Sequence, residues 1–370
     1  MTAGYESYGS ASGPTGSRWL WIIGGLIGFV IAAAIGVVAL GTFNSGIDPD
    51  LGYDLKGANS FALVLALALL VGFVVYAGLE YLQTRRLGSI TGQFGTRTLV
   101  LMPVAIAFNI ILGQAVGAAL KIPIYLDSIG TILVGALAGP IAGALTGLLS
   151  NLIWSYVLPP PFHSDISGAF AIVAAVIGIL AGVFARIGWL RPRPNRNVGQ
   201  LAVGAIIAVG LIVVLSWLAY LGYTAILDSP DLAPGGDNFV FQLLGWLALA
   251  LVVGTVIGLI LLLFVKRDLS AAYVVVAGVI TGLVAASISA PISANVFGGV
   301  TGAGTDFIVL AFRQAGADIS AAALGQGLIS DPIDKVVTFF VVYLILGALA
   351  TRTKARFPQG EKLVAPEPGF

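Results

Sequence analysis

Long apolar runs recur along the whole chain and constrain its fold more than any other feature. A hydrocarbon core about 30 Å thick is crossed by roughly 20 helical residues, so each run of about 17 to 25 apolar residues predicts one membrane-spanning helix. Ten such runs lie at residues 19–41, 60–82, 99–120, 124–139, 141–158, 167–190, 200–222, 239–264, 271–290 and 332–350. The sequence therefore predicts an all-α, polytopic membrane protein with about ten transmembrane helices.

Composition agrees with this class and excludes several others. Apolar residues make up 58% of the chain and charged residues 9%, whereas a soluble domain carries roughly 25% charged residues. The chain has no cysteine and one histidine, His163, which excludes disulfides, thiolate zinc sites and thiol nucleophiles. We expect no metal, no cofactor and no nucleic-acid partner.

Charged residues between the runs alternate in sign from one loop to the next. The basic clusters consist of Arg85, Arg86 and Arg97, of Arg186, Arg191, Arg193 and Arg196, of Lys266 and Arg267, and of Arg352, Lys354 and Arg356. The acidic residues of the other loops are Asp48, Asp50, Asp54, Asp165, Asp228, Asp231 and Asp237. Because basic loops stay in the cytoplasm, both termini are predicted to be cytoplasmic.

One stretch, residues 290–335, breaks the apolar pattern with closely spaced polar and charged residues. A charge at the bilayer centre costs about 2.5 to 3.5 kcal/mol, so we expect these acids near the outer membrane face. The predicted topology brings the stretch close to the loop at 121–131 and to the end of the run at 141–158. Aromatic walls with a few polar groups are the usual form of a small-molecule site. The candidate substrate-binding residues are Asp127, Ser128, Asn151, Trp154, Asn295, Asp306 and Asp331.

Some of these polar residues have a structural interpretation that stays open beside the functional one. Asp127 is either a ligand or a cap of the helix that follows it. Asp331 precedes Pro332, which suits an N-cap followed by a proline in the first turn of the last span. Asp334 and Lys335 are adjacent and do not share a helix face, so each is expected to need another partner. Lys335 could reach Asp331, four residues earlier.

Small residues recur at every fourth position in two segments. They are Gly135, Gly139, Gly143 and Gly147 in one segment and Gly113 and Gly117 in the other. Such spacing lets helix backbones approach closely in a membrane. It predicts either internal helix packing or a docking groove for a partner helix, and the break at Gly139–Pro140 favours internal packing for the first series.

Motifs for catalysis are missing from the sequence. There is no HExxH, no GxSxG and no nucleophile with a nearby histidine base, so we do not expect an enzyme. A GxxxxGK[ST] phosphate-binding loop is also missing. ATP-driven work would therefore require partner subunits that bind the nucleotide.

Four segments together resemble the substrate-binding S components of energy-coupling factor transporters. They are RTLVLMPVAIAFNIILGQ from Arg97, LKIPIYLDSIGTILVGALAGPIAGALTGLLSNLIW from Leu120, APISANVFGGVTGAGTDF from Ala290 and GLISDPIDKVVTFFVVYLIL from Gly327. The resemblance covers about residues 97–356. It implies a six-helix core in a prokaryotic plasma membrane that captures a vitamin or similar micronutrient on the outside. A membrane coupling subunit and two ABC-type ATPases would deliver it across the bilayer.

The resemblance also implies a division of the chain and a docking site. Partner docking would involve Ala105 and Asn109, the nearest equivalent here of the AxxxA pattern of that family. The expected segments are a disordered cytoplasmic tail at 1–17, a two-helix extension at 18–96, core helices at 97–198, an inserted two-helix hairpin at 199–268, the last core helices at 269–356 with a long extracytoplasmic loop at 291–331, and a cytoplasmic tail at 357–370.

Two other functions stay open. An ion-coupled secondary transporter is indicated by a loose similarity between residues 127–151, which end in GLLSN, and residues 306–331, which end in GLISD. A membrane sensor or assembly scaffold would need a signalling partner that the chain does not reveal.

Overall fold

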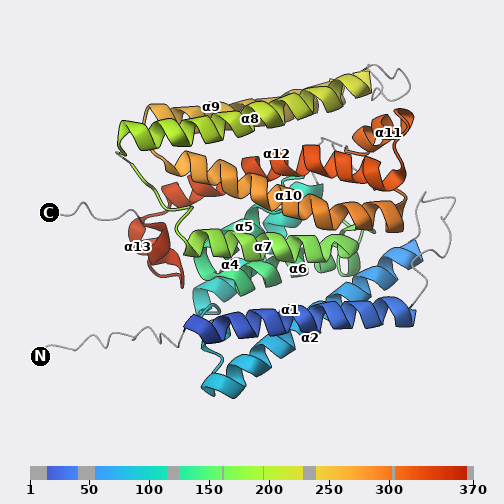
Figure 1. Ribbon diagram of the computed structural model, residues 1–370, viewed down its shortest axis with the longest axis vertical. Coiled ribbons are helices and arrows are strands. Elements are labelled where there is room, and N and C mark those ends of the chain that lie inside the picture. Colours follow the sequence, from blue (N-terminus) through green and yellow to red (C-terminus); the bar gives the residue numbers. More distant parts are fainter. Residues whose placement is uncertain are drawn as a thin grey trace, which may run out of the picture. The chain divides into compact units, whose positions relative to one another are not determined.

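The computed structural model describes residues 15–40, 55–114, 125–160, 162–194, 196–227, 239–301 and 305–364, and these residues form helices and turns without any strand (Figure 1). This confirms the predicted all-α class. The predicted tails at 1–14 and 365–370, the acidic residues at 48–54 and 228–237, and residues 115–124 with Gly117 lie outside the described residues.

The chain divides into two compact units. Unit 1 consists of Met1–Gly41 and Leu63–Ile90, and unit 2 of Thr42–Ala62 and Thr91–Phe370. In unit 1, α1 (Thr15–Leu40) packs against the greater part of α2 (Leu55–Thr84), which is followed by α3 (Gly88–Thr91). A Cβ atom at Gly72 of α2 would lie only 2.8 Å from the Gly25 carbonyl oxygen of α1. Close contact of small residues therefore joins the two apolar helices of unit 1.

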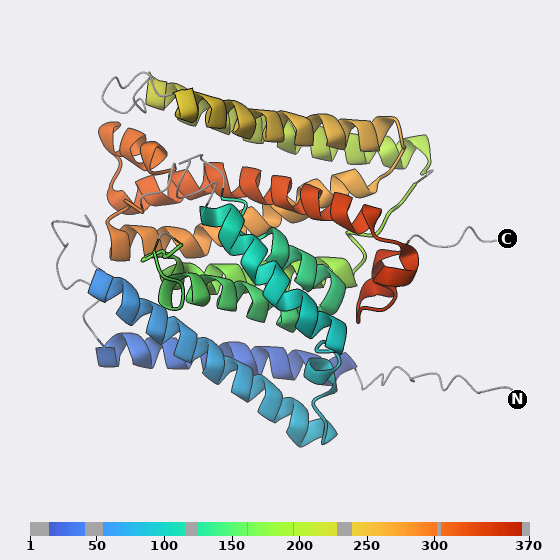
Figure 2. The ribbon, with the colours of Figure 1, turned by 180° about the vertical axis from the view of Figure 1, so that it is seen from behind.

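Unit 2 contains the remaining helices. They are α4 (Thr96–Leu112), α5 (Ile129–Ala138), α6 (Pro140–Tyr156), the 3-10 turn η2 (Ser167–Phe170), α7 (Ala171–Arg186), α8 (Val198–Leu227), α9 (Phe239–Phe264), α10 (Ser270–Phe297), α11 (Asp306–Gln314), α12 (Ile319–Ala348), α13 (Thr351–Lys354) and the 3-10 turn η3 (Gly360–Leu363). Helices α4 to α7 form one group, and α10 lies alongside α12, with α8 and α9 packed on that pair (Figures 1 and 2).

Five of the described helical segments are long and apolar enough to cross a membrane: Trp19–Ala39, Lys56–Thr84, Ser167–Arg186, Val198–Leu215 and Ser270–Phe297. Shorter apolar helices are Thr96–Leu112, Ile129–Ala138 and Val253–Phe264. Helix α12 has 30 residues but carries Asp331, Asp334 and Lys335 near its middle. The chain is therefore a helical protein with several segments suited to a bilayer, and charge is concentrated in one of its longest helices.

Small residues allow α5, α6 and α7 to pack in close contact. A Cβ atom at Gly135 would lie 2.7 Å from the Gly178 carbonyl oxygen, and one at Gly143 would meet the same oxygen at 2.7 Å. Gly147 likewise lies against the backbone of Ala174. Gly139, at φ +130°, forms the break between α5 and α6. The glycine series at 135–147 therefore serves internal packing, and we exclude its use as a docking groove for a separate helix.

The ends of the last helices differ from the prediction. Helix α10 continues through Pro291 to Phe297, and α12 begins at Ile319, where the Asp318 side chain accepts a hydrogen bond from the Ala321 backbone N–H at 2.8 Å. The predicted long loop at 291–331 is therefore largely helical, and the interpretation of Asp331 as an N-cap is wrong. Pro332 lies inside α12, where close packing against a neighbouring helix makes a proline tolerable.

The predicted cytoplasmic tail is also partly structured. After α13, the chain returns to the end of α5, where the Gln359 backbone N–H donates to the Leu137 carbonyl at 2.9 Å. The Arg191 side chain donates to the Val364 carbonyl, and Leu363 is buried. Residues up to 364 thus belong to unit 2, because an apolar side chain and backbone hydrogen bonds hold them there.

We expect Gly178→Ala to lower the stability of the protein by about 1 to 3 kcal/mol, because a Cβ atom there would overlap the Gly143 backbone. Gly210→Ala in α8 is the matched control, since a Cβ atom there meets nothing within 4 Å. An exposed helical glycine replaced by alanine gains roughly 0.5 to 1 kcal/mol. Thermal unfolding in detergent measures both variants, and equal melting temperatures would contradict the close contact of α6 and α7.

Candidate ligand pocket

A pocket opens inside unit 2, with an empty volume of about 980 Å³ that includes the space at its mouth. Its walls come from α6, η2, α7, α10 and α12 and from the segment that precedes α5. The lining residues are Gly113, Tyr125, Asp127, Asn151, Trp154, Ser164, Ile166, Ser167, Phe170, Val173, Ala285, Ser289, Ser293, Thr301, Gln326, Asp331 and Lys335.

The pocket lies at the end of unit 2 that is opposite to the basic residues. Helix α7 contributes Val173 near its start and ends at Arg186. Helix α12 contributes Gln326 and Asp331 from its first half and is followed by Arg352. Asp331 lies 12 residues after Ile319, which corresponds to about 18 Å along the helix. The pocket therefore extends from one end of unit 2 toward its middle.

Lys335 lies at the inner wall of the pocket and is only 4% exposed. Its ammonium group donates to the Ser128 hydroxyl at 3.0 Å and to the Asp334 carboxylate, and it lies 3.7 Å from Asp127 Oδ1. As predicted, Asp334 and Lys335 each have another partner, but they also contact each other, because the long lysine side chain bends back to its neighbour. Among the described residues, Lys335 makes no ion pair with Asp331.

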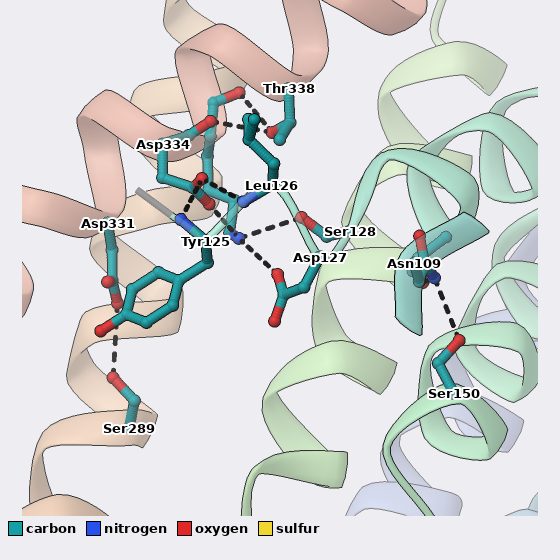
Figure 3. Close-up of polar contacts among 12 residues, drawn as sticks. Asn109, Tyr125, Leu126, Asp127, Ser128, Ser150, Ser289, Asp331, Asp334 and Thr338 are labelled. Carbon is teal, nitrogen blue, oxygen red and sulfur yellow. Dashed lines mark hydrogen bonds and ion pairs between the residues drawn. The ribbon is translucent and has the colours of Figure 1, made fainter. Parts of the chain in front are cut away.

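Asp334 is fully buried and ties the segment before α5 to α12. Its Oδ1 accepts hydrogen bonds from the backbone N–H groups of Tyr125 at 3.0 Å and Leu126 at 2.9 Å (Figure 3). Leu126 has a φ of +52°, a left-handed conformation that is uncommon for a residue with a side chain. The Asp334 carboxylate thus holds this strained turn in place and positions Tyr125 and Asp127 beside the pocket.

Asp331 is the second carboxylate that lines the pocket, and it is 7% exposed. It accepts hydrogen bonds from the hydroxyls of Ser289 and Ser330, each at 3.3 Å (Figure 3). Ser330 in turn accepts from the Gln326 amide at 2.6 Å. Both hydrogen bonds to Asp331 are longer than the usual 2.5 to 3.0 Å for O–H···O bonds. The carboxylate is therefore only weakly bound by neighbouring side chains.

Aromatic rings also line the pocket. Trp154 lies against Gly113, where a Cβ atom would be 2.5 Å from the ring, and its indole N–H donates to the Gln114 amide oxygen at 3.3 Å. Phe170 stacks on Phe297 with ring centroids 5.6 Å apart. The Asn151 amide lines the pocket without a hydrogen bond to any of the described residues. This wall offers flat apolar surface and one amide with free bonding capacity.

The structure brings together Asp127, Asn151, Trp154 and Asp331 among the predicted site residues. It places the other three differently. Ser128 is buried beside the pocket and bonds to Lys335. Asn295 is exposed and donates to the Pro291 carbonyl of its own helix. Asp306 accepts from the backbone and the hydroxyl of Thr301, at 2.9 and 2.8 Å, so it supports a lining residue and does not line the pocket itself.

Sequence reasoning left several lining residues out of the candidate site. Ser289 and Ser293 are four residues apart on α10, and Gln326 and Lys335 lie on α12. The spacing of the two serines in an otherwise apolar helix is a periodic signal that was available in the sequence. The α12 residues were harder to place, because the predicted helix began too late.

The predicted docking residues Ala105 and Asn109 are buried, which corrects their assignment. The Asn109 amide donates to Ser150 at 3.0 Å (Figure 3). It also donates to Thr131 at 2.8 Å, and its oxygen accepts from the Gly130 N–H at 2.7 Å. Ala105 lies against Gly130. These residues join α4, α5 and α6, so they are not accessible to a partner subunit.

Comparison of the chain with protein-family models, with curated proteins and with solved structures found no match. Across the part of the chain that the structure describes, no group of three or more His, Cys, Asp or Glu side chains is arranged to hold a metal ion. The function is therefore argued from the geometry of the pocket.

We expect Asp334→Ala to destabilise the protein by about 3 to 5 kcal/mol, because it leaves the buried Lys335 ammonium poorly compensated. It also removes the acceptor of the Tyr125 and Leu126 N–H groups. Asp334→Ala combined with Lys335→Met should recover part of the loss, since no unpaired ammonium remains. Glu361→Gln, at an exposed position, is the control. Unfolding in detergent compares the four proteins, and a double variant less stable than Asp334→Ala would contradict the pairing.

Proposed function

We propose that this chain is the substrate-capture component of an energy-coupling factor type importer in a prokaryotic plasma membrane. It binds a small micronutrient from the outside in the pocket of unit 2. The observation that carries the proposal is the convergence of Asp127, Asn151, Trp154 and Asp331 on one pocket, at the end of unit 2 away from the basic residues. The positive-inside rule assigns that end to the extracytoplasmic side.

The proposed topology has ten spans with both termini in the cytoplasm. Helices α4, α5, α6, α7, α10 and α12 form the six-helix core, and the hairpins α1/α2 and α8/α9 are additions to it. Helix α5, with 10 residues, covers about 15 Å, or half of a bilayer core about 30 Å thick. Before it, the turn that carries Tyr125 and Leu126 is held by Asp334 beside the pocket.

In this proposal, partner subunits supply the energy for transport. The sequence has no phosphate-binding loop, so a membrane coupling subunit and two ABC-type ATPases supply the ATP-driven step. They contact a surface other than Ala105 and Asn109, because both residues are buried between helices.

An ion-coupled secondary transporter is the second candidate, and one observation favours it. Asp331, Asp334 and Lys335 lie near the middle of α12 rather than at its outer end. Ionisable residues at such depth frequently serve ion or proton coupling in carriers. The two candidates differ in what drives uptake, so dependence on the coupling subunit separates them.

Mass spectrometry of small molecules that remain bound during purification tests the capture function. We expect one metabolite to co-purify with the unaltered protein and to be lost from Trp154→Ala, because the ring forms one wall of the pocket. Trp19→Ala is the matched control, since Trp19 is 67% exposed in unit 1. Retention of the metabolite in Trp154→Ala would place its binding site elsewhere.

Uptake of that metabolite in cells with and without the coupling subunit and its ATPases tests the driving force. Uptake should fall to background when these partners are deleted. Uptake that persists in their absence and collapses when the ion gradient is dissipated would replace this proposal by the ion-coupled carrier.

Labelling of introduced cysteines tests which end of unit 2 faces the outside of the cell. Each introduced cysteine is the sole thiol in its variant, because the chain has no cysteine of its own. Phe162→Cys lies near the pocket end and Lys266→Cys at the basic end, and both positions are exposed. We expect a membrane-impermeant maleimide to label residue 162 in intact cells and residue 266 only after lysis. The reverse pattern would contradict the proposed orientation.

A further inference from the structure

The charges around the pocket do not balance. Asp127, Asp331 and Lys335 are the charged residues among those that line it, and Asp334 lies directly behind Lys335. Three carboxylates against one ammonium leave two negative charges when all four groups are ionised. Carboxylates removed from water are costly unless a cation or several hydrogen-bond donors compensate them.

The lysine is already paired with two carboxylates. Lys335 donates to Asp334 and to the Ser128 hydroxyl, and it forms a longer ion pair with Asp127 at 3.7 Å. Asp331 receives only two hydroxyl hydrogen bonds of 3.3 Å. Asp127 and Asp334 thus share one ammonium, and Asp331 is the lining carboxylate that has no ion pair among the described residues, so the pocket keeps a net negative charge.

The walls of the pocket suit an organic cation better than a bare metal ion. Tyr125, Trp154 and Phe170 contribute rings to them, and the described residues include no group of three or more His, Cys, Asp or Glu side chains that could hold a metal ion. Aromatic faces attract organic cations through the ring quadrupole. The buried Asn151 amide, which no described residue satisfies, adds a polar contact for a hydrogen-bonding ligand group.

We infer that the ligand is an organic cation, with its positive charge held by Asp331 and Asp127 and its flat apolar part against Trp154 and Phe170. This inference rests on the proposed capture function and names the chemical class of its substrate. Lys335 keeps Asp334 neutralised, and the ligand neutralises the carboxylates that face the cavity.

Matched sets of small molecules that differ in charge test the inference. Phenethylamine, tryptamine and benzyltrimethylammonium are each compared with a neutral alcohol and a carboxylate on the same ring frame. The full chain in detergent is heated with each probe, and its melting temperature is recorded over a range of probe concentrations. We expect the cations to raise the melting temperature and their neutral and anionic counterparts to have little effect.

Substitutions in the pocket test whether the rise in melting temperature comes from cation binding at this site. Asp331→Asn keeps the shape and the capacity to bond with Ser289, and it should weaken cation binding roughly tenfold to a hundredfold because a charge-assisted contact is lost. Asp127→Asn provides a second variant if the first does not fold. Glu361→Gln, exposed at the opposite end of unit 2, should bind cations like the unaltered protein.

The outcomes separate this inference from the function on which it rests. Neutral or anionic probes that stabilise the protein as well as the cations do would overturn the cation inference and leave capture in place. Sodium chloride or potassium chloride that stabilises the protein as well as the organic cations do, at the same ionic strength, would also overturn it. Stabilisation by no probe would count against both, and binding of cations without uptake would support the inference while removing the transport function.

Discussion

The buried contact between Asp334 and Lys335 is the interaction on which the pocket depends. Asp334 accepts two backbone hydrogen bonds from the segment before α5, and Lys335 bonds to Ser128 in the same segment. A carboxylate and an ammonium so far from water are stable only with such complete pairing. The pair therefore fixes a turn with Leu126 in a left-handed conformation to the middle of α12, and that turn carries Tyr125 and Asp127 to the cavity.

Close helix packing supplies the rigid frame around this contact. In lipid, where apolar side chains gain little from meeting each other, small residues and buried hydrogen bonds hold helices together. Gly143 and Gly178 bring α6 against α7, and Gly278 and Gly282 bring α10 against α12. The Asn109 amide bonds to both α5 and α6. This frame brings the two carboxylates and the aromatic side chains to the same cavity.

Part of the site was predictable from local sequence features. Asn151 and Trp154 lie within one helical turn, and Asp127 and Asp331 stand out as acids in apolar surroundings, so these four were selected correctly as pocket residues. The selection of Asn295 and Asp306 did not hold, because their side chains satisfy nearby backbone groups. The main errors in helix limits lie at two prolines: the predicted spans ended at residue 290 and began at residue 332, yet Pro291 and Pro332 both lie inside long helices.

The sequence by itself determined the all-α class, the presence of apolar helices suited to a membrane and the small-residue spacing that packs α5, α6 and α7. These properties follow from the apolar content and the periodicity of single segments, which are local. Only the tertiary structure decided that Lys335 pairs with Asp334, that Asn109 is internal and that Asp331 faces a cavity with weak partners. Those outcomes depend on which residues come within hydrogen-bond distance of each other in the fold, although they lie up to about two hundred positions apart in the chain. Local sequence patterns do not specify such long-range contacts.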